Sequence, residues 1–353
     1  MTKFWSEIAK RAEPYVPGEQ INKENIIKLN TNENPYPPSP HVILAITNEV
    51  GNNLRLYPSP TMEELRTTIA GYYNVTKENV FVGNGSDEVL AFSFMGFFDP
   101  GKAIRFPDIT YSFYPVYARV FDITYETIPL RDDFTMDVEA FYNSEGGVIF
   151  PNPNAPTSLY LGIDDIEAIV KHNKDNIVIV DEAYIDFAME SAVSLTKRYD
   201  NLLVIQTMSK SRALAGLRIG YAIGNEELIA ALIRMKDSFN SYPVDRLALA
   251  GASAAIKDEA YFQQMKKKII ATREQTTKAL ISLGFHVLPS ASNFVFATHE
   301  TMPAKALYEQ LRERDILIRH FGTEPIENYV RISIGTDEEM DKFIQAVTEI
   351  IER

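Results

Sequence analysis

The sequence predicts an α/β protein: a large domain with a mostly parallel central sheet, followed by a smaller C-terminal α+β domain. The chain has 353 residues, of which 45% are apolar, so it can bury more than one core. Apolar runs such as NIVIV and LLVIQ alternate with helical patterns, and uninterrupted apolar strands are typical of a parallel sheet covered on both faces. After Gly284, shorter runs such as NFVFA and YVRISIG alternate with helical segments, which predicts the smaller domain.

The chain divides into three predicted regions. The segment LNTNENPYPPSP contains four prolines, which favour an extended arm, so residues 1–47 are predicted to form an N-terminal arm that packs on the small domain. Residues 48–243 form the predicted large domain. Helical apolar spacing from about 244 to 283 predicts a long helix that joins the domains, and residues 244–353 contain this helix and the small domain.

Composition excludes several classes of function. The net charge of -13, from 35 basic and 48 acidic residues, opposes binding to nucleic acid or to anionic lipid. The absence of cysteine excludes disulfides, thiolate metal sites and cysteine nucleophiles. The five histidines show no metal-ligand spacing, so no metal is expected.

Two further features bear on location. The longest apolar run, VLAFSFMGFF, is about half the ~20 residues that a membrane helix needs. The N-terminal sequence mixes charges throughout and lacks the apolar core of a signal peptide. The sequence therefore predicts a cytoplasmic enzyme or binding protein.

Polar residues follow two of the predicted strands, at the sheet edge where open α/β proteins bind ligands. After VFV, the turn GNGSDE places Ser86 and Asp87 at a helix start, where free N–H groups and the helix dipole favour a phosphate. The alternative is that Ser86 or Asp87 only caps the helix. NIVIVDEAY ends its strand with Asp181 and places Tyr184 three residues later; the alternative for Asp181 is that it caps the following turn.

Two more strand ends carry candidate binding groups. In TMSKSRALAGLRIGY, Ser209 and Arg218 suit a phosphate, and the amine of Lys210 is a candidate nucleophile for an aldehyde carbon of the same ligand. Taken alone, a lysine is more often a solvated charge. Tyr111 follows IRFPDIT, where its ring is placed to stack on a planar ligand, although core packing is the alternative.

These motifs together carry a family resemblance over nearly the whole chain. NENPYPPSP, IVDEAYIDF, SKSRALAGLRIGY and YVRISIGT resemble fold-type I pyridoxal-phosphate-dependent aminotransferases and, within them, the histidinol-phosphate aminotransferase family. The resemblance implies pyridoxal 5'-phosphate as cofactor and a homodimer. It also implies exchange of an amino group between histidinol phosphate and 2-oxoglutarate, in histidine biosynthesis.

The resemblance also implies residue roles. Lys210 would hold the cofactor as a Schiff base, Asp181 would pair with its ring nitrogen, and Tyr184 with its phenolic oxygen. Tyr111 would stack on the ring. The other implied cofactor contacts are Gly85, Ser86, Asp87, Ser209, Arg218 and, from the neighbouring subunit, Tyr57. The implied substrate contacts are Tyr15, Asn32, Arg319 and Arg331, with surface charge as the alternative for both arginines.

The chain departs from the family pattern in the segment NPNAPTS, where the family usually has NPNNPTG. Ala155 replaces the asparagine that bonds the cofactor's phenolic oxygen in the family. Either Asn154 takes over this contact or Tyr184 acts alone. Ser158 replaces a glycine, so the turn itself is expected to differ. Arg212, where the family often has an apolar residue, has no explanation from the sequence.

Other functions compatible with the motifs are a phosphothreonine-type decarboxylase and an aromatic or broad-range aminotransferase, which use the same cofactor. A ligand-sensing aminotransferase-like domain is the alternative outside enzymes. The intact Lys210 and the lack of a basic N-terminal helix-turn-helix argue against such a sensor.

Overall fold

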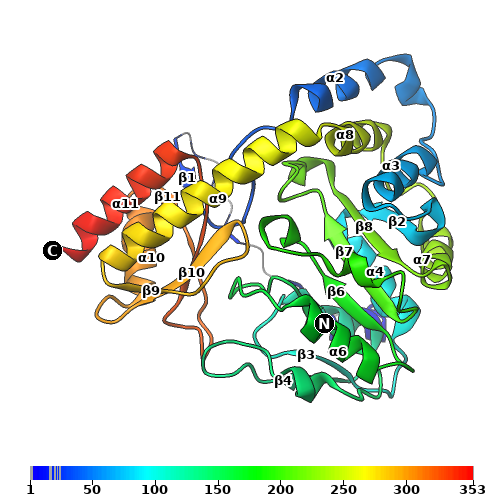
Figure 1. Cartoon of the computed structure of the whole chain (residues 1–353), viewed down its shortest axis with the longest axis horizontal. Helices are drawn as coiled ribbons and strands as arrows, with labels where there is room; N and C mark the ends of the chain where they lie inside the picture. The colour runs from blue at the N-terminus through cyan, green and yellow to red at the C-terminus, as the bar shows by residue number, and fades with distance from the viewer. Residues whose placement is uncertain (1–2, 16–17, 20, 22, 24, 353) are drawn as a thin grey trace.

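The computed structural model describes residues 3–352 apart from 16–17, 20, 22 and 24. A seven-stranded sheet lies at the centre of the larger part of the molecule (Figure 1). The strand order is β2-β8-β7-β6-β5-β3-β4. The pairs from β7 to β4 are parallel, whereas β8 is antiparallel to both of its neighbours. The strands are β2 (Val80–Asn84), β3 (Ile104–Pro107), β4 (Tyr125–Ile128), β5 (Val148–Pro151), β6 (Val178–Asp181), β7 (Leu202–Thr207) and β8 (Ile219–Gly224). The prediction of an α/β fold with a mostly parallel sheet is confirmed.

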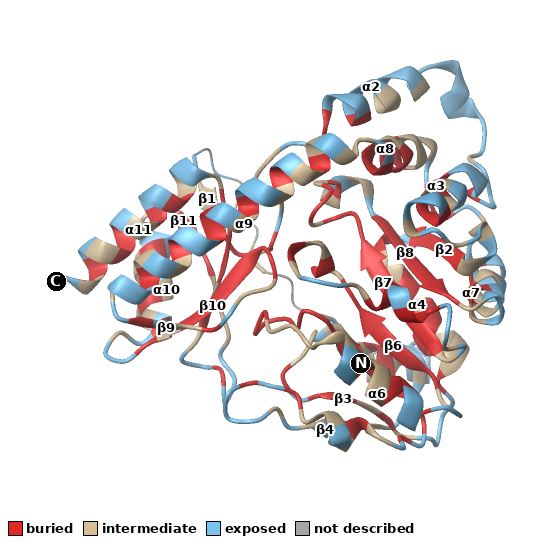
Figure 2. Ribbon diagram, viewed as in Figure 1, coloured by how far each residue is buried: buried red, intermediate tan, exposed pale blue. Residues whose placement is uncertain are grey.

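Helices cover both faces of this sheet, and the strands alternate their side chains between two apolar cores. In β6, Val178 and Val180 enter one core, while Ile179 enters the other. The first core is shared with α3 (Glu63–Tyr73), α6 (Ile163–His172) and α8 (Arg246–Lys257), and the second with α4 (Gly85–Phe97), α5 (Phe113–Phe121) and α7 (Glu226–Phe239). Figure 2 shows the central strands as almost continuously buried, as expected for a sheet covered on two faces.

A second, four-stranded sheet has the order β12-β13-β10-β9 and is antiparallel throughout. Its strands are β9 (Phe285–Val287), β10 (Phe294–His299), β12 (Arg319–His320) and β13 (Val330–Ser333). Helices α10 (Ala304–Glu313) and α11 (Asp337–Ile351) share its apolar core. This arrangement agrees with the predicted α+β region, while the exact domain boundaries stay a prediction.

The N-terminal region contacts both parts of the molecule. Strand β1 (Ile27–Lys28) pairs with β11 (Ile316–Leu317) beside the smaller sheet. In contrast, α1 (Glu7–Arg11) lies on α5, where Arg11 Nη2 donates to Val120 O at 3.0 Å. Helix α2 (Pro40–Glu49) packs on α8. The arm therefore packs on the smaller part through its non-helical residues, such as Glu19, which pairs with Arg312 of α10, and β1, whereas its two helices pack on the larger part.

The predicted long helix over 244–283 is two helices, α8 and α9 (Glu259–Ser282). Asp258 separates them: its backbone leaves the helical region at φ -91° and ψ 63°, and its side chain accepts from Tyr261 N. Aspartate competes with helix continuation in this way because it can cap a new helix. Helix α9 then runs from α8 to the smaller sheet (Figure 1).

The remaining elements are short 3-10 turns at Asn52–Arg55, Lys77–Asn79, Val138–Phe141, Ile185–Phe187, Ala192–Leu195 and Ala215–Leu217. Among the described residues, none of the helices has both the length and the apolar character needed to cross a bilayer. The cytoplasmic location stays a prediction.

Arg212 is buried and ties the loop that carries Lys210 to the α8–α9 junction. Its guanidinium lies 3.5 Å from the centre of the Phe262 ring, and its Nη1 donates to Ala255 O at 2.8 Å. Its Nη2 lies 3.4 Å from Glu259 Oε2. An arginine is needed here because it stacks on an aromatic ring and satisfies a backbone carbonyl at the same time.

We expect Arg212→Ala to lower the free energy of unfolding by about 2–3 kcal/mol, because it removes the ring contact and leaves a buried carbonyl without its donor. Urea unfolding followed by circular dichroism measures the change. The exposed Arg234 of α7 is the control, and Arg234→Ala should stay within ~0.5 kcal/mol of the wild type. Equal stability of the two variants would contradict this role for Arg212.

Candidate active site

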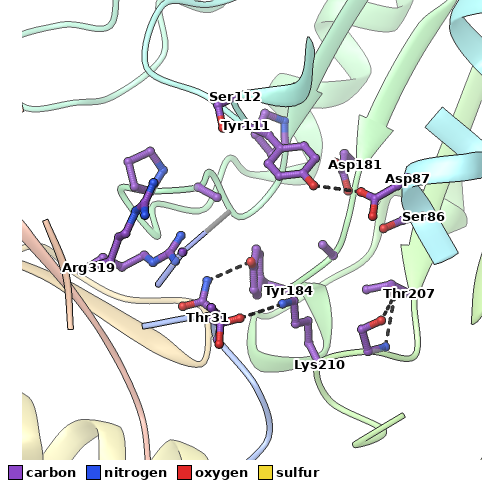
Figure 3. A pocket seen from close by; sticks show the side chains of 18 of the residues that line it. Thr31, Ser86, Asp87, Tyr111, Ser112, Asp181, Tyr184, Thr207, Lys210 and Arg319 are labelled. Carbon is purple, nitrogen blue, oxygen red and sulfur yellow. Dashed lines mark hydrogen bonds between the residues drawn. The ribbon is translucent and has the colours of Figure 1, made fainter. Parts of the chain in front are cut away.

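A cavity of about 250 Å³ lies between the carboxyl ends of β6 and β7 and the smaller sheet. Asp181 and Thr207, the last residues of these strands, line it from one side, and Arg319 and Arg331 line it from the smaller sheet (Figure 3). The predicted site residues that line it are Tyr15, Asn32, Ser86, Asp87, Tyr111, Asp181, Tyr184, Ser209, Lys210, Arg218, Arg319 and Arg331. The fold therefore brings together residues that are far apart in the sequence.

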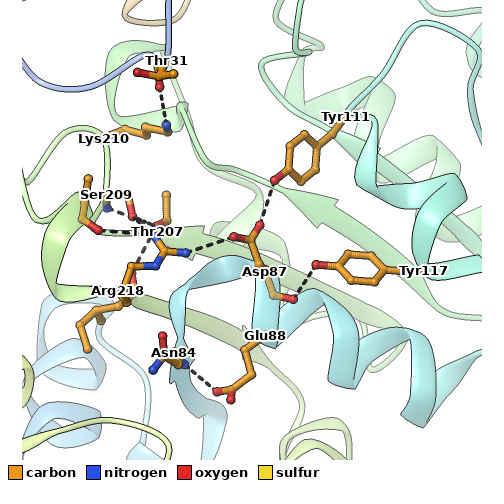
Figure 4. A network of polar contacts seen from close by, with 12 residues as sticks. Thr31, Asn84, Asp87, Glu88, Tyr111, Tyr117, Thr207, Ser209, Lys210 and Arg218 are labelled. Atoms are coloured by element: carbon orange, nitrogen blue, oxygen red, sulfur yellow. Dashed lines mark hydrogen bonds and ion pairs between the residues drawn. The ribbon is translucent and has the colours of Figure 1, made fainter. Parts of the chain in front are cut away.

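One end of the cavity is built for an anion. Ser86 and Asp87 lie in the first turn of α4, and Arg218 Nη2 bonds Asp87 Oδ2 at 3.1 Å (Figure 4). Arg218 Nη1 also lies 3.4 Å from Ser209 Oγ, and Tyr111 OH donates to Asp87 Oδ1 at 2.9 Å. A helix N-terminus beside a guanidinium and a hydroxyl is a typical phosphate site.

Two glycines make this close arrangement possible. Gly85 has φ +78°, and a Cβ on it would lie 2.5 Å from Arg218 Nη2. A Cβ on Gly220, in the neighbouring strand β8, would lie 2.2 Å from Ser86 N. Gly85 thus does not line the cavity itself; it permits the turn and the approach of Arg218.

The Lys210 amine lies at the centre of the site. Its Nζ donates to Thr31 O at 3.1 Å, as Figures 3 and 4 show. Within the described part of the chain, no carboxylate lies at ion-pair distance from it. The loop is fixed from outside, since Asn34 Nδ2 donates to Lys210 O at 3.2 Å and to Ser211 O at 3.0 Å. Among the described residues, the amine is therefore held by one hydrogen bond, and the backbone that carries it is anchored by Asn34.

Asp181 is buried, and one of its two carboxylate oxygens has no hydrogen-bond partner among the described residues. Its Oδ2 accepts from Tyr114 OH at 3.0 Å, whereas its Oδ1 has no partner among the described residues. Burial raises the pKa of Asp181 to about 7. A buried carboxylate oxygen without a donor is costly, so this site favours a ligand with a cationic N–H group.

The adjacent Glu182 points away and has its own partners. It accepts from Ser191 Oγ at 2.6 Å, from Ala192 N at 2.6 Å and from Gln206 Nε2 at 2.8 Å. Burial raises its pKa to about 7 as well. Because its oxygens are satisfied inside the protein, Glu182 supports the strand ends and leaves Asp181 as the carboxylate of the cavity.

The other end of the cavity carries two arginines. Neither Arg319 nor Arg331 forms an ion pair within the described part of the chain. Arg331 Nη2 donates to Asn30 O at 2.9 Å, its Nε has no partner among the described residues, and burial lowers its pKa. Two cations without counter-ions at one wall favour an anionic substrate group.

Besides Gly85, two predicted cofactor contacts do not line this cavity: Asn154, and Tyr57, which was predicted to serve the neighbouring subunit. Asn154 donates through Nδ2 to Ile109 O at 3.1 Å and to Thr157 Oγ1 at 2.9 Å, so its amide N–H groups are already used, although its Oδ1 has no partner among the described residues. The expectation that Asn154 replaces the missing asparagine is not met in this structure, because Ala155 is the residue that lines the cavity. Tyr57 is 79% exposed and lies outside the cavity.

Several lining residues were not predicted as site residues. They are Gly18, Asn30, Thr31, Thr110, Ser112, Pro151, Ala155, Pro156, Ala183, Thr207 and Phe321. Asn30 and Thr31 belong to the LNTNENP segment and Thr110 precedes Tyr111, so their neighbours gave a usable signal. Phe321 follows the predicted Arg319 by two residues, which is a weaker signal of the same kind.

Comparisons with known proteins agree with this geometry. A family model described as aminotransferase class I and II matches residues 24–347. Histidinol-phosphate aminotransferase 1 of Oceanobacillus iheyensis is 58% identical over 351 residues, which covers 99% of each chain. Histidinol-phosphate aminotransferase of Clostridium acetobutylicum is 56% identical over 351 residues, with 99% of this chain and 100% of the relative covered.

Solved structures of similar proteins have the same fold. A histidinol-phosphate aminotransferase from Clostridium acetobutylicum aligns with a TM-score of 0.86 at 25% identity, covering 93% of this chain and 99% of that one. The enzyme of the same name from Sinorhizobium meliloti, in complex with pyridoxal-5'-phosphate, aligns with a TM-score of 0.90 at 24% identity, covering 100% and 98%. This second likeness concerns the fold.

The buried Asp181 predicts a pH-dependent stability of the ligand-free protein. With its pKa raised from 3.8 to about 7, the folded state keeps a proton that the unfolded state releases, so this residue lowers stability as pH rises from about 4 to 7. The melting temperature of Asp181→Asn, relative to the wild type, should therefore increase over this range and level off above it. The exposed Asp164→Asn serves as the control. A difference for Asp181→Asn that does not vary with pH would contradict the prediction.

Proposed function

The chain belongs to the class I and II aminotransferase family, and from this premise we propose that it transfers the amino group of L-histidinol phosphate to 2-oxoglutarate, in histidine biosynthesis. It is an aminotransferase that uses pyridoxal 5'-phosphate. The observation that carries the choice of substrates is the pair Arg319 and Arg331, which lie without carboxylate partners, within the described residues, in the same cavity as the Lys210 amine.

The residues of the cavity fit this cofactor. Its ring nitrogen, once protonated, would give the unpartnered Asp181 Oδ1 the donor that it lacks. Its phosphate would bind at the N-terminus of α4, with Arg218 and Ser209. Lys210 would hold its aldehyde, Tyr184 its phenolic oxygen, and Tyr111 the face of its ring.

Pyridoxal phosphate supplies an aldehyde for the substrate amine and an electron sink that acidifies the substrate Cα. The protein must then move one proton over a short distance while water is excluded. Lys210 is suited to take the proton from Cα and to return it, because among the described residues its Nζ has one hydrogen bond, to Thr31 O, and its backbone is held by Asn34. Asp181 would stay ionised beside the cationic ring and would keep the ring nitrogen protonated, which makes the ring a better electron sink.

The arginine end of the cavity would orient both substrates. Histidinol phosphate carries its phosphate, and 2-oxoglutarate its C5 carboxylate, at a distance from the reacting carbon. A guanidinium fork matches either group, so Arg331, with Arg319 beside it, can bind the two anions in turn. Tyr15, which also lines the cavity and stacks on Phe113 at 4.4 Å, would close the site on the solvent side.

An amine-donor panel with 2-oxoglutarate as acceptor tests the proposed function. Histidinol phosphate should give glutamate with a higher kcat/KM than phenylalanine. Preference for phenylalanine would indicate an aromatic aminotransferase. Release of carbon dioxide without any 2-oxo acid would indicate a decarboxylase, and cofactor binding without turnover would indicate a sensor.

Lys210→Ala should lower kcat by about 10³-fold or more and remove the visible absorption band of the bound cofactor. The control is Lys174→Ala, at an exposed lysine, which should leave both kcat and the absorption band unchanged.

We also infer that two copies of the chain form a dimer. Many of the large apolar side chains that are exposed in one chain lie in two stretches, Ile43, Leu44, Val50, Leu54, Leu56 and Tyr57, and Phe239 with Tyr242, while others such as Trp5 and Ile281 lie elsewhere. The Tyr57 ring stacks on Tyr242 at 4.8 Å, and Arg246 Nη2 donates to Tyr57 O at 3.1 Å. Exposed apolar patches of this kind favour a protein interface. Tyr57 would then serve the phosphate site of the partner subunit.

Subunit mixing tests the contribution of Tyr57 across the interface. In a mixed dimer of Lys210→Ala and Tyr57→Ala chains, one site has both defects and the other has none. Co-expression of the two variants should therefore restore activity to about a quarter of the wild-type sites if the chains pair at random. Activity that never exceeds that of the separate variants would place Tyr57 in its own subunit's site or outside both, and a monomeric mass in solution would exclude the dimer.

A further inference from the structure

Asn32 occupies a special position between the two sheets. It is buried, with 1% of its surface exposed, and has a left-handed backbone at φ +57°. Its Nδ2 donates to Tyr184 OH at 2.9 Å, and its Oδ1 accepts from Ser333 Oγ at 2.9 Å. Its backbone N–H donates to the same Ser333 Oγ at 2.9 Å, and its carbonyl accepts from Asn293 Nδ2 at 3.0 Å. The Asn32 side chain therefore has a hydrogen-bond partner at each end.

The hydrogen bonds of Ser333 determine which way the Asn32 amide faces. Ser333 Oγ already accepts the Asn32 backbone N–H, so its single proton must go to an acceptor, and Asn32 Oδ1 is that acceptor. A flipped amide would aim two donors at Ser333 Oγ and leave the serine proton without a partner. The NH₂ group of Asn32 consequently faces Tyr184.

This orientation fixes the proton of the tyrosine. An amide NH₂ can only donate, so the Tyr184 oxygen accepts from Asn32 and its own O–H proton must point elsewhere. Ala155 and Phe294 pack against Tyr184 and offer side chains without acceptors, with the Phe294 ring edge-on at 5.1 Å. Tyr184 itself lines the cavity, and no acceptor for its proton is present among the described residues.

We propose that Asn32 is a positioning residue that holds Tyr184 as a hydrogen-bond donor into the cavity, toward an oxygen of the bound cofactor. The proposal rests on the proposed function, because it takes pyridoxal phosphate as the ligand. It also gives Asn32 a role other than substrate contact. Since Ser333 follows Arg331 by two residues on β13, the strand that carries the anion-binding arginine also anchors the Tyr184 donor.

The test compares Asn32→Asp, Asn32→Gly and Tyr184→Phe as holoenzymes. Asn32→Asp keeps the shape of the side chain but replaces its donor by a carboxylate, so the Tyr184 proton should turn toward residue 32 and away from the cavity. Asn32→Gly removes the amide while tolerating the positive φ. The readout is the pH midpoint at which the visible absorption band of the bound cofactor changes.

A donor near a ligand oxygen stabilises the anionic form of that oxygen, so losing it should raise the midpoint. We expect Asn32→Asp and Tyr184→Phe each to raise it by about one pH unit, since a hydrogen bond to a charged group is of that order. Asn32→Gly should raise it less, because the freed hydroxyl can still turn to the cavity.

The double variants separate positioning from charge. If Asn32 acts through Tyr184, then adding Asn32→Asp or Asn32→Gly to Tyr184→Phe should shift the midpoint little further. A shift of equal size with and without the tyrosine hydroxyl would mean that the new charge acts alone, and would overturn the proposal. If the Asn32 variants left the midpoint unchanged but raised KM for the amine donor, the proposal would also be overturned, because Asn32 would then act by contacting the substrate. Wild-type protein without a cofactor band would instead refute the proposed function.

Discussion

The site depends on one short segment, residues 29–34, which holds the two sheets against each other. Leu29 N donates to Leu317 O, and Ser333 N donates to Leu29 O, so the segment is hydrogen-bonded into the smaller part of the molecule. From the same segment, the carbonyl of Thr31 accepts from Lys210 Nζ, and Asn34 Nδ2 bonds the backbone of the lysine loop. The segment therefore helps to hold Arg319 and Arg331 of the smaller sheet opposite the amine of Lys210, which follows β7 of the larger sheet.

The site retains polar groups that an ordinary core would exclude. Asp181 Oδ1 and Arg331 Nε are buried without partners among the described residues, and each destabilises the ligand-free protein. The apolar cores on both faces of the large sheet offset this cost. A ligand that offers a cationic N–H at one end and an anion at the other supplies the missing partners, so binding and stability are linked.

Buried networks around the site fix the orientation of its groups. Glu182, although adjacent to Asp181 and equally buried, is satisfied by three internal donors and stays outside the chemistry. Arg212 anchors the lysine loop from behind through Phe262 and Ala255. Residues outside the cavity, such as Glu182 and Arg212, thus help to fix the strand ends and the loop that carry its functional groups.

The mostly parallel sheet and the residues at its strand ends are predictable from the sequence, because uninterrupted apolar strands and the polar groups after them are local signals. Asp181, Ser209 and Lys210 are predictable for this reason. Three outcomes follow instead from contacts between distant parts of the chain: Asn154 turns away while Ala155 lines the cavity, Asp258 divides a predicted helix, and the arm's helices pack on the larger part. These outcomes depend on which distant residues hydrogen-bond to each polar group and which pack against each apolar face. Local sequence patterns carry no information about such partners.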